Sequence, residues 1–525
     1  AGVRAGVFRD LSCRLEASGM RQRRSNRALA LGWITLALTV MLAGCVNLAP
    51  EYESPAPVIP GVWPGVDIYG APPAEPGADV SMLGWRDFFI DDRLREVVST
   101  ALSHNRDLAV ATLNIAAARA QVADINADLF PSVSSSTSAT FSRAGRTAGG
   151  DDTASGNLAN QSAISESLST EIGFSSYELD IFGRLRNQRV AAVQSLLATT
   201  ADRRAAQISL IGEVAANWLT LAADKALLAL ARNTLTNRLA SLRLVNARHD
   251  YGIASGSDVA NARSAVEAVR VDIASLVAQV AQDENALNRV AGTTLAPGLL
   301  PEARLPEQAV LERLPAGVPS AVLLDRPDVI AAEYRLAGDY ASIGAARAAF
   351  FPRISLTAAT GWATRGLTGL FADDNRSWSV TPQIDVPIFD GGSRAAQLAL
   401  ARIQREIDSQ SYEQTLRTAF REVADALALR ATIDDQISAQ TALVAANQRS
   451  YRLSQARYRA GTDSYLDTLI EQRTLYTSQQ NAIQRRLARE INLVTLYKTL
   501  GGGDLARSSR SALPLAPLAD ATPAP

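Results

Sequence analysis

The sequence is poor in the residues that build most catalytic and metal sites. Its 525 residues include only two histidines and two cysteines, too few for a zinc site or a Cys/His pair. Net charge is −1, and there is no basic block or ladder of aromatic residues, so nucleic-acid binding is not supported. His104 and His249 lie in helical segments without a nucleophile motif. We therefore expect no enzymatic activity and no cofactor.

Long hydrophobic runs are also scarce. The segment from Arg184 to Asp250 has no proline and a single glycine, Gly212, which predicts a helix roughly 100 Å long at 1.5 Å per residue. Charged residues such as Arg203 and Glu213 recur along it too often for a membrane span, which needs about 20 apolar residues. Beyond the N-terminal signal, we expect no transmembrane helix.

The N-terminus has the pattern of a secretion signal. Residues 1–19 show no periodicity, and we expect translation to begin at Met20, followed by an arginine-rich region and an apolar stretch at 28–41. The stretch ends in Leu-Ala-Gly-Cys45, which resembles the bacterial lipobox. In that motif the thiol is acylated and the signal peptide, here within residues 1–44, is removed. Val46 follows rather than the aspartate that retains lipoproteins at the inner membrane, so the motif implies the outer membrane.

A β-hairpin is predicted at residues 352–389. Apolar residues alternate with small or hydroxylated ones along both limbs, giving one apolar and one polar face. Pro352 ends the preceding helix and Gly391-Gly392 opens the next. Strands of about ten residues with this pattern are typical of a membrane β-barrel, although this hairpin taken alone fits a soluble sandwich equally well.

The hairpin occurs twice. Phe130-Pro131 opens an earlier copy at residues 131–182, and Pro131 and Pro352 are 221 residues apart. Beyond the hairpins the spacing becomes 209 residues, as between Gly252 and Gly461. The chain is therefore predicted to be two tandem repeats, at 91–296 and 320–502. The remaining segments are a Pro-rich tether at 45–90, a connector at 297–319 and a disordered tail at 503–525.

Each repeat is predicted to contain a long helix, a tight turn and a returning helix. In the second repeat these are 394–459 and 463–500. Apolar residues recur there every seven positions, which predicts antiparallel coiled-coil packing. We interpret most tyrosines and leucines of this pattern as packing residues.

The strand count has a consequence for assembly. Four strands cannot close a membrane barrel, because about eight are the minimum and lipid does not tolerate an open sheet edge. The chain must therefore oligomerise. Helices of roughly 100 Å are much longer than the bilayer core of about 30 Å, so they must project far out of the membrane. These arguments do not fix the number of subunits.

Several phrases resemble the outer-membrane efflux proteins of the TolC/OprM type, particularly the lipoprotein branch called NodT. They are Tyr-Glu-Leu-Asp-Ile-Phe-Gly-Arg-Leu-Arg at 177–186, Phe-Phe-Pro-Arg-Ile-Ser-Leu-Thr at 350–357 and Pro-Ile-Phe-Asp-Gly-Gly at 387–392. The resemblance implies an α+β membrane protein. In such a homotrimer, a twelve-stranded β-barrel with four strands per chain is continued by a coiled-coil tunnel in the periplasm. It also implies two partners, an inner-membrane RND pump and a periplasmic adaptor, with drugs or small toxic compounds as cargo.

The same resemblance places a periplasmic gate at the two helix turns. Asp258 matches the gating carboxylate and Tyr458 the tyrosine that bonds it. Leu466 matches a leucine constriction, Asp467 an aspartate ring facing the lumen, and Arg473 an arginine near that ring. For Asp463 and Asp467 the competing interpretation is a solvated acid of the turn or a helix N-cap, since Asp463 opens a predicted helix.

Two positions depart from the family pattern. The arginine that TolC places after Gly-Thr is Asp463 here, so that salt bridge cannot form. The second aspartate ring position is Ile470, with Glu471 beside it. We expect the lock to depend more on Leu466 and on coiled-coil packing.

Two alternatives remain. A passive scaffold or adhesin lipoprotein would explain the lipobox and the coiled coils, but not the alternating hairpins. Within the channel interpretation, the rival is the outer-membrane channel of a type I, ABC-driven secretion system, since the tunnel sequence does not specify the cargo.

Overall fold

The computed structural model describes residues 47–56, 59–60, 63, 80–142, 165–306, 308–311, 320–365 and 369–505. Cys45, the predicted signal peptide and nearly all of the predicted tail lie outside these residues. The chain divides into two compact units. One comprises residues 1–51, 123–191 and 340–402, and the other residues 52–122, 192–339 and 403–525.

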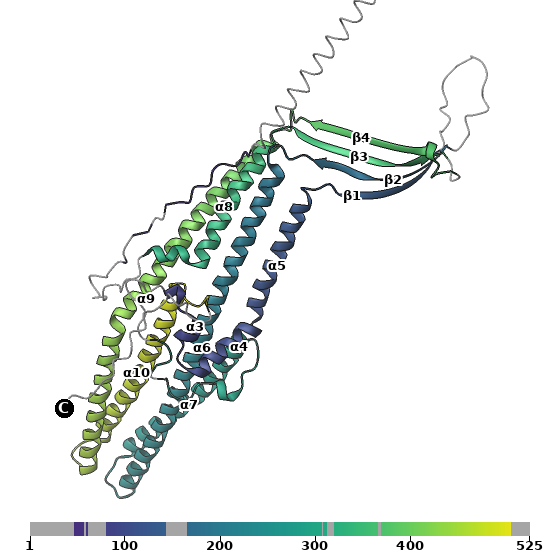
Figure 1. The fold of residues 1–525 in the computed structure, drawn as a ribbon. Helices are drawn as coiled ribbons and strands as arrows, with labels where there is room; N and C mark the ends of the chain where they lie inside the picture. The colour runs from purple at the N-terminus through teal and green to yellow at the C-terminus, as the bar shows by residue number, and fades with distance from the viewer. Residues whose placement is uncertain are drawn as a thin grey trace, which may run out of the picture. The chain divides into compact units, whose positions relative to one another are not determined.

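The first unit contains a four-stranded antiparallel sheet in the order β1-β2-β3-β4 (Figure 1). Its strands are β1 (Val133–Ser142), β2 (Ser165–Glu178), β3 (Arg353–Thr364) and β4 (Arg376–Asp385). Each predicted hairpin forms, and β2 pairs with β3 to join the two repeats. β1 and β4 are the outer strands, so each has one unpaired edge within the chain.

The register gives the sheet one apolar and one polar face, as the alternation predicted. Paired residues project to the same side of an antiparallel sheet. Val133, Phe174 and Val380 therefore share the apolar face with Trp378, while Ser136, Glu171 and Ser377 share the polar face. Gly361 lies opposite Glu171, where an added Cβ would come within 2.1 Å of the Thr170 carbonyl oxygen. Neighbouring strands approach too closely at this point for any side chain.

The return limb of the second hairpin is shorter than predicted. β4 ends at Asp385, whereas the alternating pattern continued to Phe389. Pro387 interrupts this stretch and has no N–H to donate to a ladder. Ile388 and Phe389 are about nine-tenths exposed in the single chain.

The helices follow the predicted order. The first repeat has α4 (Asp92–His104), α5 (Arg106–Ala127), α6 (Arg184–Asp250) and α7 (Gly256–Ala291). The second has α8 (Pro327–Ala348), α9 (Ser393–Ala460) and α10 (Tyr465–Thr499). α6 has the predicted limits, and α4 is separated from α5 at Asn105. Leu416, Val423 and Tyr476 are buried, in agreement with the seven-residue pattern.

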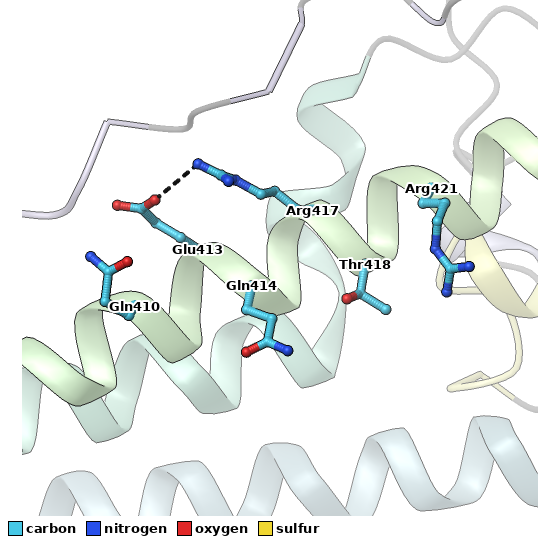
Figure 2. Close-up of a pocket in the computed structure, with 6 residues that line it drawn as sticks. All are labelled: Gln410, Glu413, Gln414, Arg417, Thr418 and Arg421. Atoms are coloured by element: carbon cyan, nitrogen blue, oxygen red, sulfur yellow. Dashed lines mark hydrogen bonds and ion pairs between the residues drawn. The ribbon is translucent and has the colours of Figure 1, made fainter.

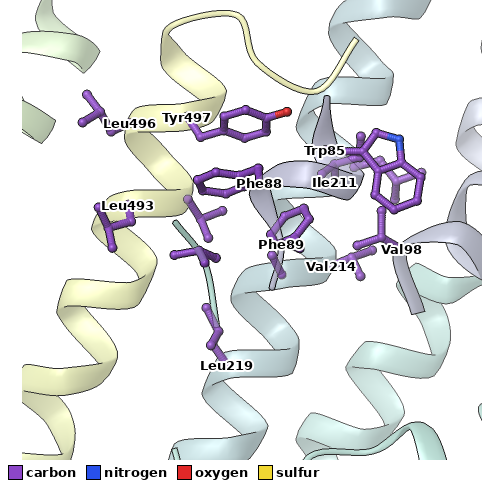
Figure 3. Close-up of a cluster of buried hydrophobic side chains, with 14 of the residues drawn as sticks. Trp85, Phe88, Phe89, Val98, Ile211, Val214, Leu219, Leu493, Leu496 and Tyr497 are labelled. Carbon is purple, nitrogen blue, oxygen red and sulfur yellow. The ribbon is translucent and has the colours of Figure 1, made fainter. Parts of the chain in front are cut away.

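A hydrophobic core holds the second unit together (Figure 3). The Phe88 ring from α3 (Trp85–Phe88) stacks on Tyr497 of α10, with ring centres 3.9 Å apart. The Tyr497 hydroxyl donates to the Leu83 carbonyl at 2.6 Å. Phe88 and Trp218 are fully buried. The predicted tether therefore ends before residue 80, because the segment after it is core.

The tail also begins later than predicted. Asp504 accepts hydrogen bonds from Arg204, the shorter at 2.7 Å, and the Leu505 carbonyl accepts from the Trp85 N–H at 2.9 Å. These contacts fix the chain up to residue 505, since they satisfy groups of α6 and α3.

The described part of the tether is held rather than free. In the first unit, Asn187 donates to the Asn47 side chain at 2.9 Å and Arg347 to the Leu48 carbonyl at 3.1 Å. In the second unit, Tyr52 donates to Glu333 at 3.1 Å and the Trp63 ring stacks on Phe420. Hydrogen bonds and one aromatic stack hold this segment in place of regular structure.

Two helices, α5 and α6, are long and apolar enough to cross a membrane by length and composition alone, with mean hydropathies of 1.2 and 1.3 over eighteen residues. The charges along α6 argue against a membrane span, yet one eighteen-residue stretch of the helix is apolar enough for one. More than half of that stretch is buried within the structure.

Candidate functional site

The predicted gate residues lie at two helical turns of the second unit that have the same geometry. One turn joins α6 to α7 and the other joins α9 to α10. Gly252 and Gly461 adopt φ of +74° and +81°, a left-handed conformation that glycine adopts without steric cost. Each glycine N–H donates three residues back, Gly252 to the His249 carbonyl at 2.8 Å and Gly461 to the Tyr458 carbonyl at 3.0 Å. The two repeats therefore build equivalent tips.

Asp258 and Asp467 occupy the same position in these tips. Each is the third residue of its helix and contacts the serine that caps it, Ser255 or Ser464. Ser255 donates from its hydroxyl to the Asp258 carboxylate at 2.8 Å, and Ser464 does so to Asp467 at 2.7 Å. The backbone N–H groups of Asp258 and Asp467 donate to the hydroxyl oxygens of the same serines. Both predicted gating acids thus also stabilise helix starts.

Tyr458 is buried but does not bond Asp258 within the chain. Its side chain is 7% exposed, and its hydroxyl has no hydrogen-bond partner in the described part of the chain. The Asp258 carboxylate accepts from Ser255 instead. Within the described part of the chain, Asp258 and Tyr458 therefore do not form the predicted bond.

An arginine that the sequence analysis did not select contacts Tyr458 instead. Arg248, near the end of α6, donates to the Tyr458 carbonyl at 2.8 Å and to the Arg459 carbonyl at 3.0 Å. Its guanidinium carbon lies 4.5 Å from the centre of the Tyr458 ring. The last carbonyls of a helix lack intrahelical partners, and a cation there is favoured by the helix dipole. Arg248 therefore caps α9 from the other repeat.

A small apolar cluster lies beneath this contact. It joins all four tip helices through Val245 of α6, Ala262 of α7, Tyr458 of α9 and Leu469 of α10. Tyr465 belongs to it, and its ring centre is 5.6 Å from that of Tyr458. Burial, followed by the neighbouring Tyr458, raises the pKa of the Tyr465 hydroxyl to about 12. The hydroxyl thus stays neutral at physiological pH.

A second tie joins the repeats further from the turns. Tyr476 of α10 donates to the Asp272 carboxylate of α7 at 3.3 Å. Arg238 of α6 lies 5.6 Å from the centre of the Tyr476 ring and donates to the Ala265 carbonyl at 2.6 Å. Burial lowers the pKa of Arg238, but arginine remains charged throughout the physiological range.

Leu466, Ile470 and Arg473 lie on an exposed face of α10. Leu466 and Ile470 are each 51% exposed and one helical turn apart, so they form an apolar strip on the single chain. Arg473 lines a groove of about 510 Å³ between α9 and α10 with Leu443, Asn447 and Ile470. This face is available for contact with another molecule or with a lumen.

Asp463 is paired within its own turn. Its carboxylate accepts from Arg457 at 2.9 Å, and Asp463 is 15% exposed. Position 463 holds an aspartate where the family pattern has an arginine. In this turn, position 463 therefore supplies the acid of a salt bridge and not the base. The arginine comes from the end of α9 and the acid from the turn.

No cofactor site is evident in the described residues. Among them, no group of three or more His, Cys, Asp or Glu could hold a metal ion. The hollow in Figure 2, about 370 Å³, is lined by one face of α9, with an ion pair of 3.3 Å between Glu413 and Arg417. A hollow along a single exposed helix is a surface feature, unlike the concave and mostly apolar pockets that bind small molecules.

Comparison with known proteins explains this combination of sheet and tips. The family model of outer membrane efflux proteins matches residues 97–293 and 318–502. The chain belongs to this family. Its fold is therefore the one the sequence predicted: a trimeric twelve-stranded β-barrel with a coiled-coil helical tunnel, built from two tandem repeats per chain. The protein is an outer-membrane channel.

Individual relatives agree with this assignment. The toluene efflux pump outer membrane protein TtgC of Pseudomonas putida is 41% identical over 470 residues, which cover 90% of this chain and 95% of TtgC. The cation efflux system protein CusC of Escherichia coli O157:H7 is 36% identical over 480 residues, covering 90% of this chain and 98% of CusC. These relatives favour efflux over ABC-driven secretion.

Solved structures show the same fold. A crystal structure of CusC has a TM-score of 0.76 and 36% identity, covering 87% of this chain and all of that one. The open state of the Neisseria gonorrhoeae MtrE outer membrane channel has a TM-score of 0.76 and 32% identity, covering 88% of this chain and all of that one.

Proposed function

We propose that this efflux protein is the exit duct of a tripartite pump. An inner-membrane RND pump and a periplasmic adaptor supply the energy and the cargo. The supporting observation is the 41% identity to a toluene efflux pump protein along 90% of the chain. The cargo class follows from the relatives: small toxic compounds such as organic solvents, with metal cations as a second candidate suggested by CusC. The duct itself performs no chemistry.

Complementation tests this proposal. The chain is expressed in a strain that lacks its own exit duct but retains an RND pump and adaptor, and survival in toluene is measured. We expect restored resistance, and an empty vector is the control. Secretion of a type I protein substrate without restored solvent resistance would favour the ABC-driven alternative.

We also propose that the two tips form the periplasmic gate. Asp258 and Tyr458 belong to the interface between repeats, Leu466 forms a constriction, and Asp467 and Arg473 line the lumen. The exposure of Leu466 supports this role, since an apolar side chain that is 51% exposed in one chain can meet its copies in a trimer. Leu466→Ala should raise resting conductance in planar bilayers. Val277→Ala, at an apolar residue of α7 that is 46% exposed and lies outside the tips, is the control and should leave it unchanged.

We propose, finally, that Cys45 is acylated and anchors the chain to the outer membrane. The supporting observation is the sequence Leu-Ala-Gly-Cys at 42–45. Mass spectrometry of the mature N-terminus should show a lipid-modified Cys45. Cys45→Ser should remove the acyl group and still permit barrel insertion, because the barrel spans the bilayer and the lipid only anchors the chain. An unmodified wild-type Cys45 contradicts the proposal.

A further inference from the structure

The arginine that links the two repeats within one chain has a counterpart that lacks an equivalent contact. At the repeat spacing of 209 residues, Arg248 corresponds to Arg457, and its acceptors at 458 and 459 correspond to His249 and Asp250. Arg248 is partly buried and donates to two carbonyls. The Arg457 side chain is 67% exposed, and its contact within the described part of the chain is with the nearby Asp463. The two tips match in their turns but differ in this contact.

The acceptors at the first tip are arranged like those at the second. The Gly252 N–H donates to the His249 carbonyl as the Gly461 N–H donates to the Tyr458 carbonyl. Each carbonyl oxygen has two lone pairs, so the His249 oxygen keeps one acceptor site, as the Tyr458 oxygen does before Arg248 binds it. The C-terminal end of α6 is therefore a preformed arginine site.

The order of the repeats around a closed barrel follows from the order of the strands. The sheet order is β1-β2-β3-β4, with a free edge on β1 and on β4. Closing a barrel from three such sheets pairs β4 of one chain with β1 of the next. The repeats then alternate around the ring, so each second repeat is followed by the first repeat of the neighbouring subunit, in the relation that first and second repeats have within a chain.

We infer that Arg457 binds the C-terminal carbonyls of α6 in the partner subunit, at His249 and Asp250, as Arg248 binds those of α9 within the chain. The tips of the trimer are thereby linked in a ring by six arginines, three within subunits and three between them. This inference depends on the trimer and is independent of the proposed gate.

Asp463 makes the contacts between subunits weaker than those within them. At the repeat spacing its counterpart is Ala254, so the first tip has no acid at the equivalent position to compete for Arg248. Asp463 accepts from one terminal nitrogen of Arg457 at 2.9 Å. It draws the guanidinium back toward its own turn, which leaves fewer of its five donors for the neighbouring subunit. The difference between the tips at this one position sets how readily subunits separate there.

Crosslinking of paired cysteines tests the contact. Arg457→Cys and Asp250→Cys are combined in the full chain, where Cys13 and Cys45 are the only other cysteines. Membranes are treated with a short bismaleimide. We expect covalent dimers and trimers on denaturing gels. The control combines Arg452→Cys with Asp250→Cys, since Arg452 is exposed on the same helix, and it should remain monomeric. Equal crosslinking in the two pairs, or none in the first, overturns the inference.

Trimer stability provides a second measurement that needs no cysteine. Arg457→Gln should lower the temperature at which trimers dissociate in detergent. Asp463→Ala, which installs the residue found at the first tip, should raise it. The combined variant should behave like Arg457→Gln, because Asp463 acts through Arg457. If neither single change moves the dissociation temperature, Arg457 does not bind the partner subunit.

Discussion

The guanidinium of Arg248 lies 4.5 Å from the centre of the Tyr458 ring, although 210 residues separate the two. The contact combines a cation–π interaction with hydrogen bonds to the end of α9. The family pattern indicated a carboxylate as the partner of this tyrosine. In this chain the main chain and ring of Tyr458 bind Arg248, while its hydroxyl is unpartnered among the described residues.

Loss of Arg248 should loosen the tips. Hydrogen bonds from a charged donor contribute about 1.5–3 kcal/mol each, so Arg248→Gln removes a substantial part of the link between repeats. We expect raised resting conductance in planar bilayers and greater sensitivity of cells to large antibiotics. Arg243→Gln, an exposed arginine one turn earlier, is the matched control and should change neither. Equal behaviour of the two variants contradicts this role.

Substitutions of Tyr458 distinguish two explanations of how the tips are held closed. If the ring acts through Arg248, Tyr458→Phe keeps the contact and leaves conductance unchanged, whereas Tyr458→Ala raises it. If instead the hydroxyl bonds Asp258 when the channel closes, Tyr458→Phe alone raises resting conductance. We expect the first result, because Asp258 already accepts from Ser255. Single-channel recordings of both variants decide between them.

Asp467 and Asp258 form a matched pair for testing lumen charge. Either change to Asn removes a carboxylate that accepts from a capping serine, and Asp258 also accepts from the Ser255 N–H, so Asp258→Asn should lose at least as much stability as Asp467→Asn. Only Asp467 is proposed to line the lumen, where three like charges attract cations. Asp467→Asn should therefore reduce cation preference in reversal-potential measurements, while Asp258→Asn should not. An unchanged preference removes Asp467 from the lumen.

Glu171 should contribute a second zone of negative charge, within the barrel. It lies midway along β2 on the polar face, where Ser136 donates to it at 3.3 Å and its partner on β3, Gly361, has no side chain. The interior of a membrane barrel is its polar side. Glu171→Gln should lower cation preference at ~0.1 M salt, where charges act over ~10 Å, and should have little effect at ~1 M, where screening shortens this to ~3 Å. Ser169→Ala on the same face is the control.

Stability should depend on pH through Asp224. Burial, followed by a hydrogen bond with Asp283 and the charge of that residue, raises the pKa of Asp224 to about 7. Lys225, paired with Glu284 at 2.9 Å, and Gln279, which donates to Asp283 at 2.8 Å, are its polar surroundings. Because the folded pKa exceeds the unfolded value of ~3.9, this stabilisation is complete below about pH 4 and is lost as pH rises through 7.

A neutral side chain at position 224 removes this dependence. Asp224→Asn should raise the melting temperature relative to the parent more at pH 8 than at pH 5, and thermal unfolding at the two pH values measures it. Asp435→Asn, an exposed acid on α9, should show no such difference. A parent protein whose melting temperature is the same at both values would contradict the prediction.

The sequence predicted the helices and hairpins well because local patterns determine them. α6 runs its full predicted length since proline is absent from it, and the glycine turns follow from the residues that permit positive φ. It could not predict contacts between distant surfaces. Arg248 has no periodic neighbour that indicates Tyr458, and only the repeat spacing, applied residue by residue, would have aligned it with Arg457. The docking of Asp504 and of the tether depends on surfaces that exist only in the folded chain.

The contacts of Asn47 and Ala49 determine when this segment can pack during biogenesis. Asn47 accepts from Asn187 of α6, and Ala49 lies so close to α8 that a Cβ on Gly344 would approach it within 2.7 Å. The helices α6 and α8 come from different repeats. This segment therefore cannot pack until the second half of the polypeptide has been synthesised and has packed on the first. A lipid anchor attached two residues before Asn47 would enter the membrane before this segment has packed on the rest of the subunit. The segment would pack only when the whole chain is folded. Its resistance to protease would therefore report completed folding of each subunit.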